Sequence, residues 1–520
     1  MTPARRELLL AAASGLALGA AFPPLPLGWL AWFAFVPLLA ALDRRAAAGA
    51  GASFRLGYAG GLVFFLAGTH WIALLSDVAT TVHWIKYLGW LLAGAYLALF
   101  WGLAAGFAAL LARRSGVPAR WTFVPAMLLV EELRGSGELG FPWFQPGYTQ
   151  HALPAIGLAA LGSVTLVTLW VLLVNAAVLD TLVRRSRAAW ALALVLVLAP
   201  WLNVSGWRAP RAVAANPGPR VALVQGDVPG EIKWSGEHQA EILRTFLSLS
   251  DSAVTRRGWD RQPVQLVVWP ETATGSYMRR QVDQSIAVAE WAAAHHVPVF
   301  AGFAHYDYGA DGKPRPMNAA GMWAPSGIGH DFYAKRHLVP FGERMPFEWL
   351  IPALGRIDLG QAEWVPGSGT VLFPSAAGPL SCLICFESIF PDLARRDVLA
   401  GARVLVNVTN DEWFGNSAAL YQHAAMAPFR AVENGVPLLR CANTGLTEII
   451  APDGRVTASA PVFHPFVLVA PVPAASGAGA TPYDRLGDWP GALAALAAAV
   501  LALRRGRARA AGALGAPPPH

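Results

Sequence analysis

The apolar stretches of this chain constrain its fold more than any other feature. A helix needs about 20 mostly apolar residues to cross a bilayer. Seven stretches before residue 205 and one near the C-terminus approach this length: 8–22, 25–42, 57–75, 87–111, 121–133, 164–183, 188–202 and 490–503. With 55% hydrophobic and only 14% charged residues, the 520-residue chain is too apolar for a soluble protein and too long for one domain. The sequence therefore predicts a multi-span α-helical membrane domain of about eight transmembrane helices. Residues 1–205 form its N-terminal part and 489–504 its last helix.

Arginine clusters indicate how these helices are oriented. With eight spans, every cluster falls on one side of the membrane, and the positive-inside rule makes that side cytoplasmic. Both termini are then cytoplasmic, 505–520 is a cytoplasmic tail, and the segment after the seventh span is extracytoplasmic. Since these flanks explain the net charge of +7, we expect no nucleic-acid partner. The clusters are Arg5 and Arg6; Arg44, Arg45 and Arg55; Arg113, Arg114 and Arg120; Arg184, Arg185 and Arg187; and Arg504, Arg505, Arg507 and Arg509.

Residues 219–473 have a different pattern, which is typical of an α/β domain. Short apolar runs alternate with longer amphipathic stretches, as expected when helices cover a sheet. The expected strands are 220–225, 264–269, 297–303, 318–323, 371–373, 381–385, 404–408, 438–442 and 466–469. The expected helices are 237–254, 279–294, 391–400 and 417–434. Segments rich in Pro, Gly, Ala and Ser at 209–219 and 473–481 mark the connections to the flanking spans.

The chain contains three cysteines: Cys382, Cys385 and Cys441. An extracytoplasmic domain held together by disulfides would normally use a larger, even number. The Cys382-x-x-Cys385 spacing is also found in redox pairs, but such pairs precede a helix, and 379–385 has the pattern of a buried strand. A disulfide between these two residues would abolish any nucleophilic role of Cys385.

Cys385 follows a hydrophobic run and is a candidate nucleophile. A thiol at a strand end is anchored on one side and accessible on the other, although a buried core cysteine is the simpler interpretation. Glu271 makes the nucleophile the better interpretation of Cys385, because this glutamate follows Val-Val-Trp-Pro, where a solvated glutamate is not expected. Glu271 could cap or pair with another group. As a base, it would take the thiol proton if burial raises its pKa towards neutrality.

Lys335 supplies the amine that would complete an acyl-transfer site. It lies in the polar segment 333–337, and a surface lysine is the alternative interpretation. In the functional interpretation its ammonium favours the thiolate and stabilises the oxyanion of a tetrahedral intermediate. Glu343 is a second carboxylate, eight residues later, that could orient Lys335. A carboxylate, an amine and a thiol together can transfer an acyl group through a thioester.

The order and spacing of Glu271, Lys335 and Cys385 resemble the Glu-Lys-Cys triad of the nitrilase superfamily. Within it, the chain is most similar to the apolipoprotein N-acyltransferase family, over essentially its whole length. Further matching motifs are Val-Gln-Gly-Asp at 224–227, Lys-Trp at 233–234, His-Leu-Val-Pro-Phe-Gly-Glu at 337–343, Asn-Asp-Glu-Trp-Phe-Gly at 410–415 and Gly-Phe-Pro-Trp at 140–143.

The resemblance implies a fold, a reaction and a location. The domain at 219–473 would be a nitrilase-like α-β-β-α sandwich in the periplasm, attached to a multi-pass protein of the bacterial inner membrane. Cys385 would take a fatty acyl group from a phospholipid and pass it to the α-amine of a diacylglyceryl-modified N-terminal cysteine of an apolipoprotein. Glu271 would move the protons. The resemblance implies no cofactor and no metal, and a protein that works as a monomer.

Other positions of the family carry over one by one. Glu387 matches a required glutamate that shapes the site. Phe386 departs from the family, which usually has tyrosine there, so the resemblance assigns no hydroxyl at this position. Trp234, Trp413 and Phe414 resemble aromatic residues on arms that meet lipid, whereas packing in the core or at the membrane interface is the alternative.

Two other functions remain open on the sequence alone. The same triad in a membrane-tethered amidase or carboxylesterase would use water as the second nucleophile, but a hydrolase of small amides gains little from eight spans. A transporter or channel with a degenerate extracytoplasmic domain is the second alternative. The apolar region contains few charges and no pair of interrupted helices, which argues against a transporter.

Overall fold

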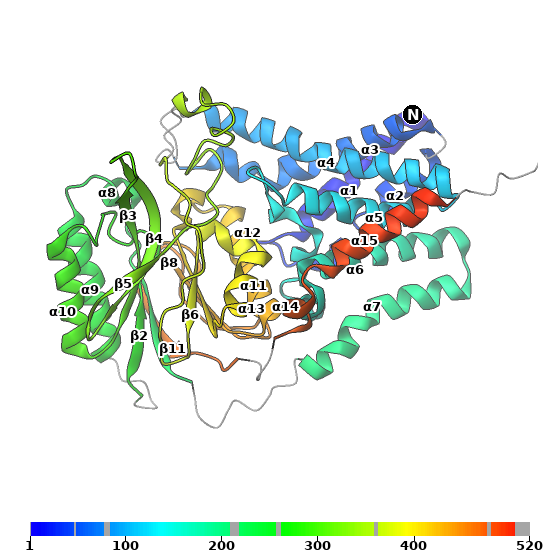
Figure 1. Cartoon of the computed structure of the whole chain (residues 1–520). Helices are drawn as coiled ribbons and strands as arrows, with labels where there is room; N and C mark the ends of the chain where they lie inside the picture. The colour runs from blue at the N-terminus through cyan, green and yellow to red at the C-terminus, as the bar shows by residue number, and fades with distance from the viewer. Residues whose placement is uncertain are drawn as a thin grey trace, which may run out of the picture.

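The structure, a computed structural model, describes residues 2–45, 48–76, 84–207, 218–255, 262–357, 362–475 and 480–504. An α/β domain lies beside a bundle of long helices, and helices of the domain separate its sheets from the bundle (Figure 1). The predicted tail at 505–520 and most of the predicted connection at 209–219 lie outside the described residues.

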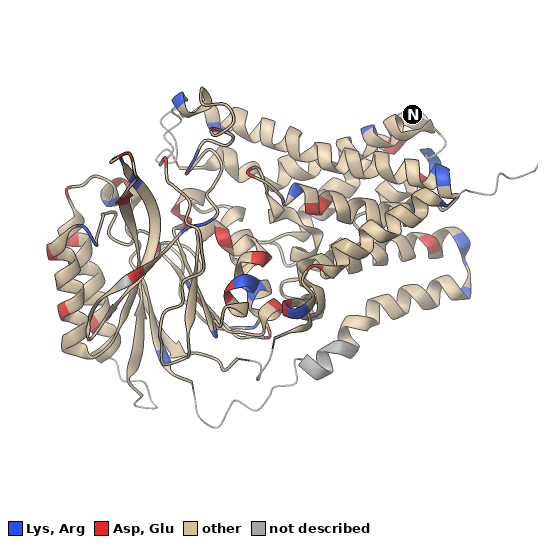
Figure 2. Cartoon of the chain, in the orientation of Figure 1, with Lys and Arg blue, Asp and Glu red and all other residues tan. Residues whose placement is uncertain are grey.

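The bundle is built from apolar helices with few charges between their ends, as Figure 2 shows for α3, α4 and α6. The long helices are α1 (Pro3–Ala21), α2 (Val36–Arg45), α3 (Ala50–Gly68), α4 (Ile85–Ser115), α5 (Ala119–Arg134), α6 (Ala159–Arg184), α7 (Arg187–Trp207) and α15 (Trp489–Leu503). Short 3₁₀ turns connect them: η1 (Gly28–Trp32), η3 (His70–Leu74), η5 (Pro142–Phe144), η6 (Pro146–Gln150) and η7 (Pro154–Leu158).

Three described segments are long and apolar enough to cross a membrane. They are Ala50–Leu74, Ile85–Ser115 and Pro154–Arg184, and two shorter apolar helices cover Arg187–Trp201 and Trp489–Leu503. Each of the eight predicted apolar stretches overlaps a helix. However, α2 has only 10 residues, and α5 carries the buried ion pair of Glu131 and Arg134. The count of eight spans therefore stays a prediction.

Small residues allow close contacts between the helices of the bundle. A side chain at Gly15 of α1 would begin 2.3 Å from the carbonyl oxygen of Gly60 in α3. One at Gly57 of α3 would begin 2.3 Å from the carbonyl oxygen of Trp101 in α4. Helices in lipid associate largely through such packing, since lipid tails are as apolar as leucine. Glycine at these positions therefore sets the spacing of α1, α3 and α4.

The α/β domain contains two facing sheets. In the larger sheet the order is β11-β1-β2-β3-β4-β5, and in the smaller it is β10-β9-β8-β7-β6. The strands are β1 (Arg220–Gln225), β2 (Val264–Val268), β3 (Val299–Tyr308), β4 (Pro314–Ala324), β5 (Gly327–Ala334), β6 (Leu380–Ile384), β7 (Val404–Thr409), β8 (Leu438–Ala442), β9 (Glu448–Ile450), β10 (Val456–Ser459) and β11 (Phe466–Pro471). Strands β1, β6, β7 and β8 are buried along their whole length, which explains their continuous apolar runs.

Helices cover the outer face of each sheet, which gives the α-β-β-α arrangement. On the larger sheet, α9 (Gln239–Thr255) contacts β1, β2 and β11, while α10 (Val282–His295) contacts β4 and β5. On the smaller sheet, α11 (Pro391–Leu399) contacts β6, and α13 (Ala427–Asn434) contacts β8 and β9. The remaining helices are α8 (Gly230–Lys233), α12 (Ala418–Ala424), α14 (Pro482–Leu486), η8 (Leu354–Arg356), η9 (Cys385–Ile389) and η10 (Asp411–Phe414).

Several predicted elements of the domain were wrong in detail. The expected strand at 371–373 is a single bridge between Phe373 and Leu380. The expected helix at 417–434 is divided into α12 and α13, because Pro428 has no N–H to continue the hydrogen-bond pattern of α12. Strands β5, β9 and β10 were not expected. Strand β5 combines two glycines with polar residues, so it lacks the apolar run that indicates a strand.

The domain touches the bundle directly behind the strand ends of the smaller sheet. The indole Nε1 of Trp143, in η5, donates to Gln422 Oε1 at 3.1 Å. The same indole stacks on the His423 ring, with centroids 5.3 Å apart and an interplanar angle of 17°. Tyr148 of η6 donates its hydroxyl to the carbonyl oxygen of Ile389 at 3.1 Å. The 140–143 motif of the apolar region is therefore part of an interdomain contact.

Candidate active site

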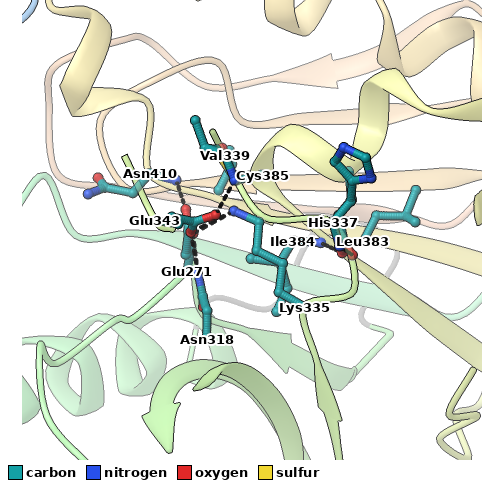
Figure 3. Close-up of polar contacts among 12 residues, drawn as sticks. Glu271, Asn318, Lys335, His337, Val339, Glu343, Leu383, Ile384, Cys385 and Asn410 are labelled. Atoms are coloured by element: carbon teal, nitrogen blue, oxygen red, sulfur yellow. Dashed lines mark hydrogen bonds and ion pairs between the residues drawn. The ribbon is translucent and has the colours of Figure 1, made fainter. Parts of the chain in front are cut away.

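The three predicted triad residues each follow the end of a strand. Glu271 comes after β2, Lys335 directly follows β5, and Cys385 directly follows β6. Strands β2 and β5 belong to the larger sheet and β6 to the smaller. Because the two sheets face each other, residues far apart in sequence meet at one end of the sandwich (Figure 3).

Cys385 has a strained backbone at the start of η9. Its φ of 50° lies in the left-handed region, which residues other than glycine rarely adopt. Strain of this kind concentrates at functional sites, where the surrounding contacts hold it in place. The carbonyl oxygen of Cys385 accepts from Asn407 Nδ2 at 3.4 Å and lies 3.2 Å from His423 Nε2. The residue is buried but retains 8% exposure, whereas Cys382 and Cys441 have none.

Glu271 is held by two hydrogen bonds through its carboxylate. Asn318 Nδ2 donates to Oε1 at 2.6 Å, and the main-chain N–H of Asn410 donates to Oε2 at 2.8 Å. The first donor comes from β4 of the larger sheet and the second from the segment after β7 of the smaller sheet. Both sheets therefore orient this carboxylate, which is 6% exposed.

Lys335 lies between two carboxylates. Its Nζ is 2.8 Å from Glu343 Oε1 and 3.8 Å from Glu271 Oε1. Glu343 is itself oriented by the N–H of Val339, which donates to Oε2 at 2.8 Å. The side chain of Lys335 is 1% exposed, so it is not the surface lysine of the alternative interpretation.

Burial and charge make the resting thiol neutral and the amine cationic. Burial raises the pKa of Cys385, and the negative charge of Glu271 raises it further, while Lys335 opposes both. Burial alone would lower the pKa of Lys335, but Glu343 and Glu271 raise it overall. Burial raises the pKa of Glu271, although Lys335 opposes this. A thiol of raised pKa needs a base beside it, and Glu271 interacts electrostatically with it.

Glu387 joins the segments that carry Lys335 and Cys385. The Tyr333 hydroxyl lies 2.7 Å from both carboxylate oxygens. The main-chain N–H groups of Arg336 and His337 donate to Oε1 at 2.6 and 3.1 Å, and that of Ile384 donates to Oε2 at 2.7 Å. Each of these groups donates a hydrogen bond, so both carboxylate oxygens of Glu387 must act as acceptors.

Replacing Glu387 by glutamine should therefore slow the reaction at Cys385 by about 10²-fold, since small displacements of reacting groups have effects of this size. The side-chain NH₂ of glutamine would face main-chain N–H groups that need an acceptor. This mismatch should also lower the free energy of unfolding by about 1–3 kcal/mol. Thermal unfolding and the rate of Cys385 acylation test both effects. Glu290→Gln, on the exposed face of α10, is the matched control. Wild-type acylation rates in the Glu387→Gln protein would contradict the positioning role.

The predicted aromatic residues lie in two environments. Trp234 and Trp413 are 41% and 36% exposed. Phe414 packs against Trp71, with centroids 5.3 Å apart, and therefore belongs to the contact with the bundle. Phe386 is buried and stacks on Phe141, with centroids 6.2 Å apart and an interplanar angle of 21°. This packing gives the Phe386 ring a role that needs no hydroxyl.

Several residues of the site were not expected from the sequence. Asn318 and Tyr333 belong to this group, as do Asp411 and His423, whose Oδ1 and Nδ1 lie 3.0 Å apart behind the nucleophile. Asn318 had a signal, because it is a polar residue at the start of an apolar run. Among the described residues no cluster of three or more His, Cys, Asp or Glu could hold a metal ion.

Comparisons with known proteins match the helical bundle and the α/β domain separately. Residues 220–480 match the family model "Carbon-nitrogen hydrolase". Residues 14–177 match the model "Apolipoprotein N-acyltransferase N-terminal domain". The fold and the matched family make the α/β part a nitrilase-like carbon–nitrogen hydrolase domain.

Similar proteins were found over nearly the whole chain. The apolipoprotein N-acyltransferase of Geobacter metallireducens is 34% identical over 96% of this chain and 96% of its own length. The apolipoprotein N-acyltransferase of Azotobacter vinelandii is 34% identical over 97% of this chain and 96% of its own length. A solved amidase from Nesterenkonia sp. is 21% identical, with a TM-score of 0.36, over 50% of this chain and 93% of its own. The chain belongs to the apolipoprotein N-acyltransferase family.

Proposed function

We propose that the protein moves a fatty acyl chain from a phospholipid to the α-amine of a diacylglyceryl-modified N-terminal cysteine of an apolipoprotein. The meeting of Glu271, Lys335 and Cys385 at the strand ends carries this proposal. Membership of the family supports the acyltransferase activity and the lipoprotein acceptor. The apolar helices beside the domain support a donor taken from the bilayer.

In the first half-reaction, Glu271 accepts the thiol proton as Cys385 Sγ attacks an ester carbonyl of the phospholipid. The carbonyl oxygen becomes an oxyanion, which the Lys335 ammonium stabilises. Preorganised charge of this kind is typically worth about 3–4 kcal/mol of the barrier. The C–O bond then breaks, Glu271 returns its proton to the departing oxygen, and lysophospholipid leaves. A fatty acyl thioester remains on Cys385.

In the second half-reaction, the acceptor amine attacks the thioester. Glu271 takes a proton from the nitrogen and delivers it to the departing Sγ, so that an amide forms and the free thiol returns. An amide is more stable than a thioester, which drives this step forward. The sequence of reactions is ping-pong and needs no cofactor or metal.

The same proposal includes the arrangement in the membrane. Residues 1–205 and 489–504 form eight spans in the bacterial inner membrane, 219–473 is the periplasmic catalytic domain, and both termini are cytoplasmic. The protein works as a monomer. Exposed Trp234 and Trp413 contact the lipid substrates, and Phe414 and Phe386 line the route by which they reach Cys385.

Mass spectrometry of the purified protein after incubation with phospholipid, without acceptor, tests the function. We expect a fatty acyl mass on the Cys385 peptide, removed by hydroxylamine and discharged by a diacylglyceryl-cysteine peptide. Discharge to water alone would favour the hydrolase. The absence of an adduct on a verified free thiol would overturn the proposed mechanism.

A further inference from the structure

A second lysine lies beneath Glu271, and the reaction as written does not use it. Lys233 ends α8 and is fully buried, with 0% exposure. Its Nζ donates to the main-chain carbonyl oxygen of Glu271 at 3.1 Å. Among the described residues, the Lys233 ammonium is held by this hydrogen bond, and it forms no ion pair with a carboxylate. A buried cation without a close carboxylate is costly, so this position requires an explanation.

The chain around Lys233 is built to hold it there. Gly275 adopts a φ of +62°, and a Cβ at this position would lie 2.1 Å from the carbonyl oxygen of Lys233. The segment after Glu271 therefore closes over the end of α8. At the other end of α8, the N–H of Gly230 donates to the carboxylate of Glu412. These contacts leave α8 little room to move relative to Glu271.

The charges of the site show that a second cation would balance a buried carboxylate. Glu271 and Glu343 are both carboxylates, and Lys335 contacts both of them, at 3.8 and 2.8 Å. With a neutral thiol, one ammonium and two carboxylates leave one negative charge uncompensated in a buried place. Lys233 would bring the charge of these four side chains to zero.

We propose that Lys233 is a positioning residue whose buried positive charge keeps Glu271 ionised, and therefore able to take the thiol proton, at neutral pH. This inference rests on the proposed function, because it concerns the base of that reaction. Lys233 contacts the main chain of Glu271, so it acts on the carboxylate through the electric field. Trp234 is the next residue after Lys233, and Trp413 follows Glu412 within η10.

Further ionisable groups surround these four side chains. Burial lowers the pKa of Lys233 to about 8, while Glu271 and Glu412 oppose this shift. Lys233 in turn lowers the pKa of Glu271, together with Lys335 and against Glu343. The ionisable groups that face the site are Lys335, His337 and Glu343 after β5, Cys385 and Glu387 in η9, and Asp411 and Glu412 in η10.

The test compares Lys233→Met and Lys233→Gln with wild type and with Lys313→Met, an exposed lysine in the turn between β3 and β4. Glutamine removes the charge but keeps a donor for the Glu271 carbonyl. The rate of Cys385 acylation by phospholipid is measured as a function of pH, alongside thermal unfolding. Since losing a positive charge raises the pKa of a carboxyl group, the acid limb should move to higher pH by about one unit or more in both variants. At pH 7 the rate should fall about tenfold or more and recover as the pH rises, while Lys313→Met matches wild type.

Alkylation of Cys385 by iodoacetamide, followed on its peptide, gives a second readout that needs no lipid. Its pH profile should shift upwards in the same two variants. If wild type forms no acyl-enzyme, the proposed function fails, but the alkylation profiles still test Lys233. A wild-type profile in Lys233→Gln would overturn the inference. Rates lowered equally at every pH, in parallel with a lower Tm, would also overturn it, because they would indicate a purely structural role.

Discussion

Replacing Cys385 by alanine should abolish acyl-enzyme formation and lower transfer at least about a thousandfold, since the substitution removes the proposed nucleophile. Cys385→Ser should retain little activity, because a buried hydroxyl is a far weaker nucleophile than a thiol beside a carboxylate. The measurements are the acyl mass on the protein and the rate of amide formation on a diacylglyceryl-cysteine peptide.

Cys382→Ala is the matched control for this experiment. Cys382 lies in β6, three residues before Cys385, and is fully buried. We expect it to retain acylation, because its thiol packs in the core and has no part in the reaction. Loss of activity in Cys382→Ala together with normal folding would favour the redox interpretation of the Cys-x-x-Cys spacing. Transfer by the Cys385→Ala protein would contradict the thioester mechanism.

Replacing Lys335 by methionine should remove activity and also weaken the fold. Without the ammonium, Glu343 and Glu271 lose the cation that both approach, and breaking a buried pair in this way typically costs about 3–5 kcal/mol. The oxyanion also loses its stabilising charge, which should slow acylation by about 10²–10³-fold. Both effects have one cause, so they should appear together.

The loss of stability should depend on pH with a definite sign. Without Lys335, the pKa of Glu271 rises further above its unfolded value, because the main opposing charge is gone. A carboxyl group of raised pKa stabilises the fold below its unfolded pKa, about 4.3, and this stability is lost as the pH rises through the folded pKa. The deficit of Lys335→Met should therefore be small near pH 4 and grow towards pH 8. Thermal unfolding in detergent at several pH values measures it, with Lys313→Met as control. A deficit that does not change with pH would contradict this electrostatic origin.

The sequence predicts the main elements of this molecule because apolar pattern and motif are local properties. The buried strands β1, β2, β6, β7 and β8 are continuous apolar runs, and each was expected within a residue or two. Strand β5 was missed because it is held by pairing with β4 rather than by its own apolar residues. The strand ends before Glu271 and Cys385 were likewise expected, and Lys335 was expected from its polar segment and motif; the roles of the three residues stay predictions.

The contacts of the site could not be predicted because they depend on the relative position of two sheets. Nothing in the sequence near Glu387 indicates that Tyr333 and Ile384 will meet at its carboxylate. Lys233 was visible only as part of a motif with Trp234, and its burial under Glu271 follows from the closure of α8 by Gly275. Long-range packing of this kind is not encoded in a local pattern.

The pairing of β1 with β11 has a consequence for the order in which the protein is assembled. These strands begin and end the α/β domain, and Arg220 lies opposite Pro471 in an antiparallel pair. The chain therefore leaves the domain beside the place where it entered. Helix α15, which follows, packs against α4, α5 and α6, made more than 300 residues earlier. During synthesis the side of the bundle that α15 covers therefore stays open until the α/β domain has been made.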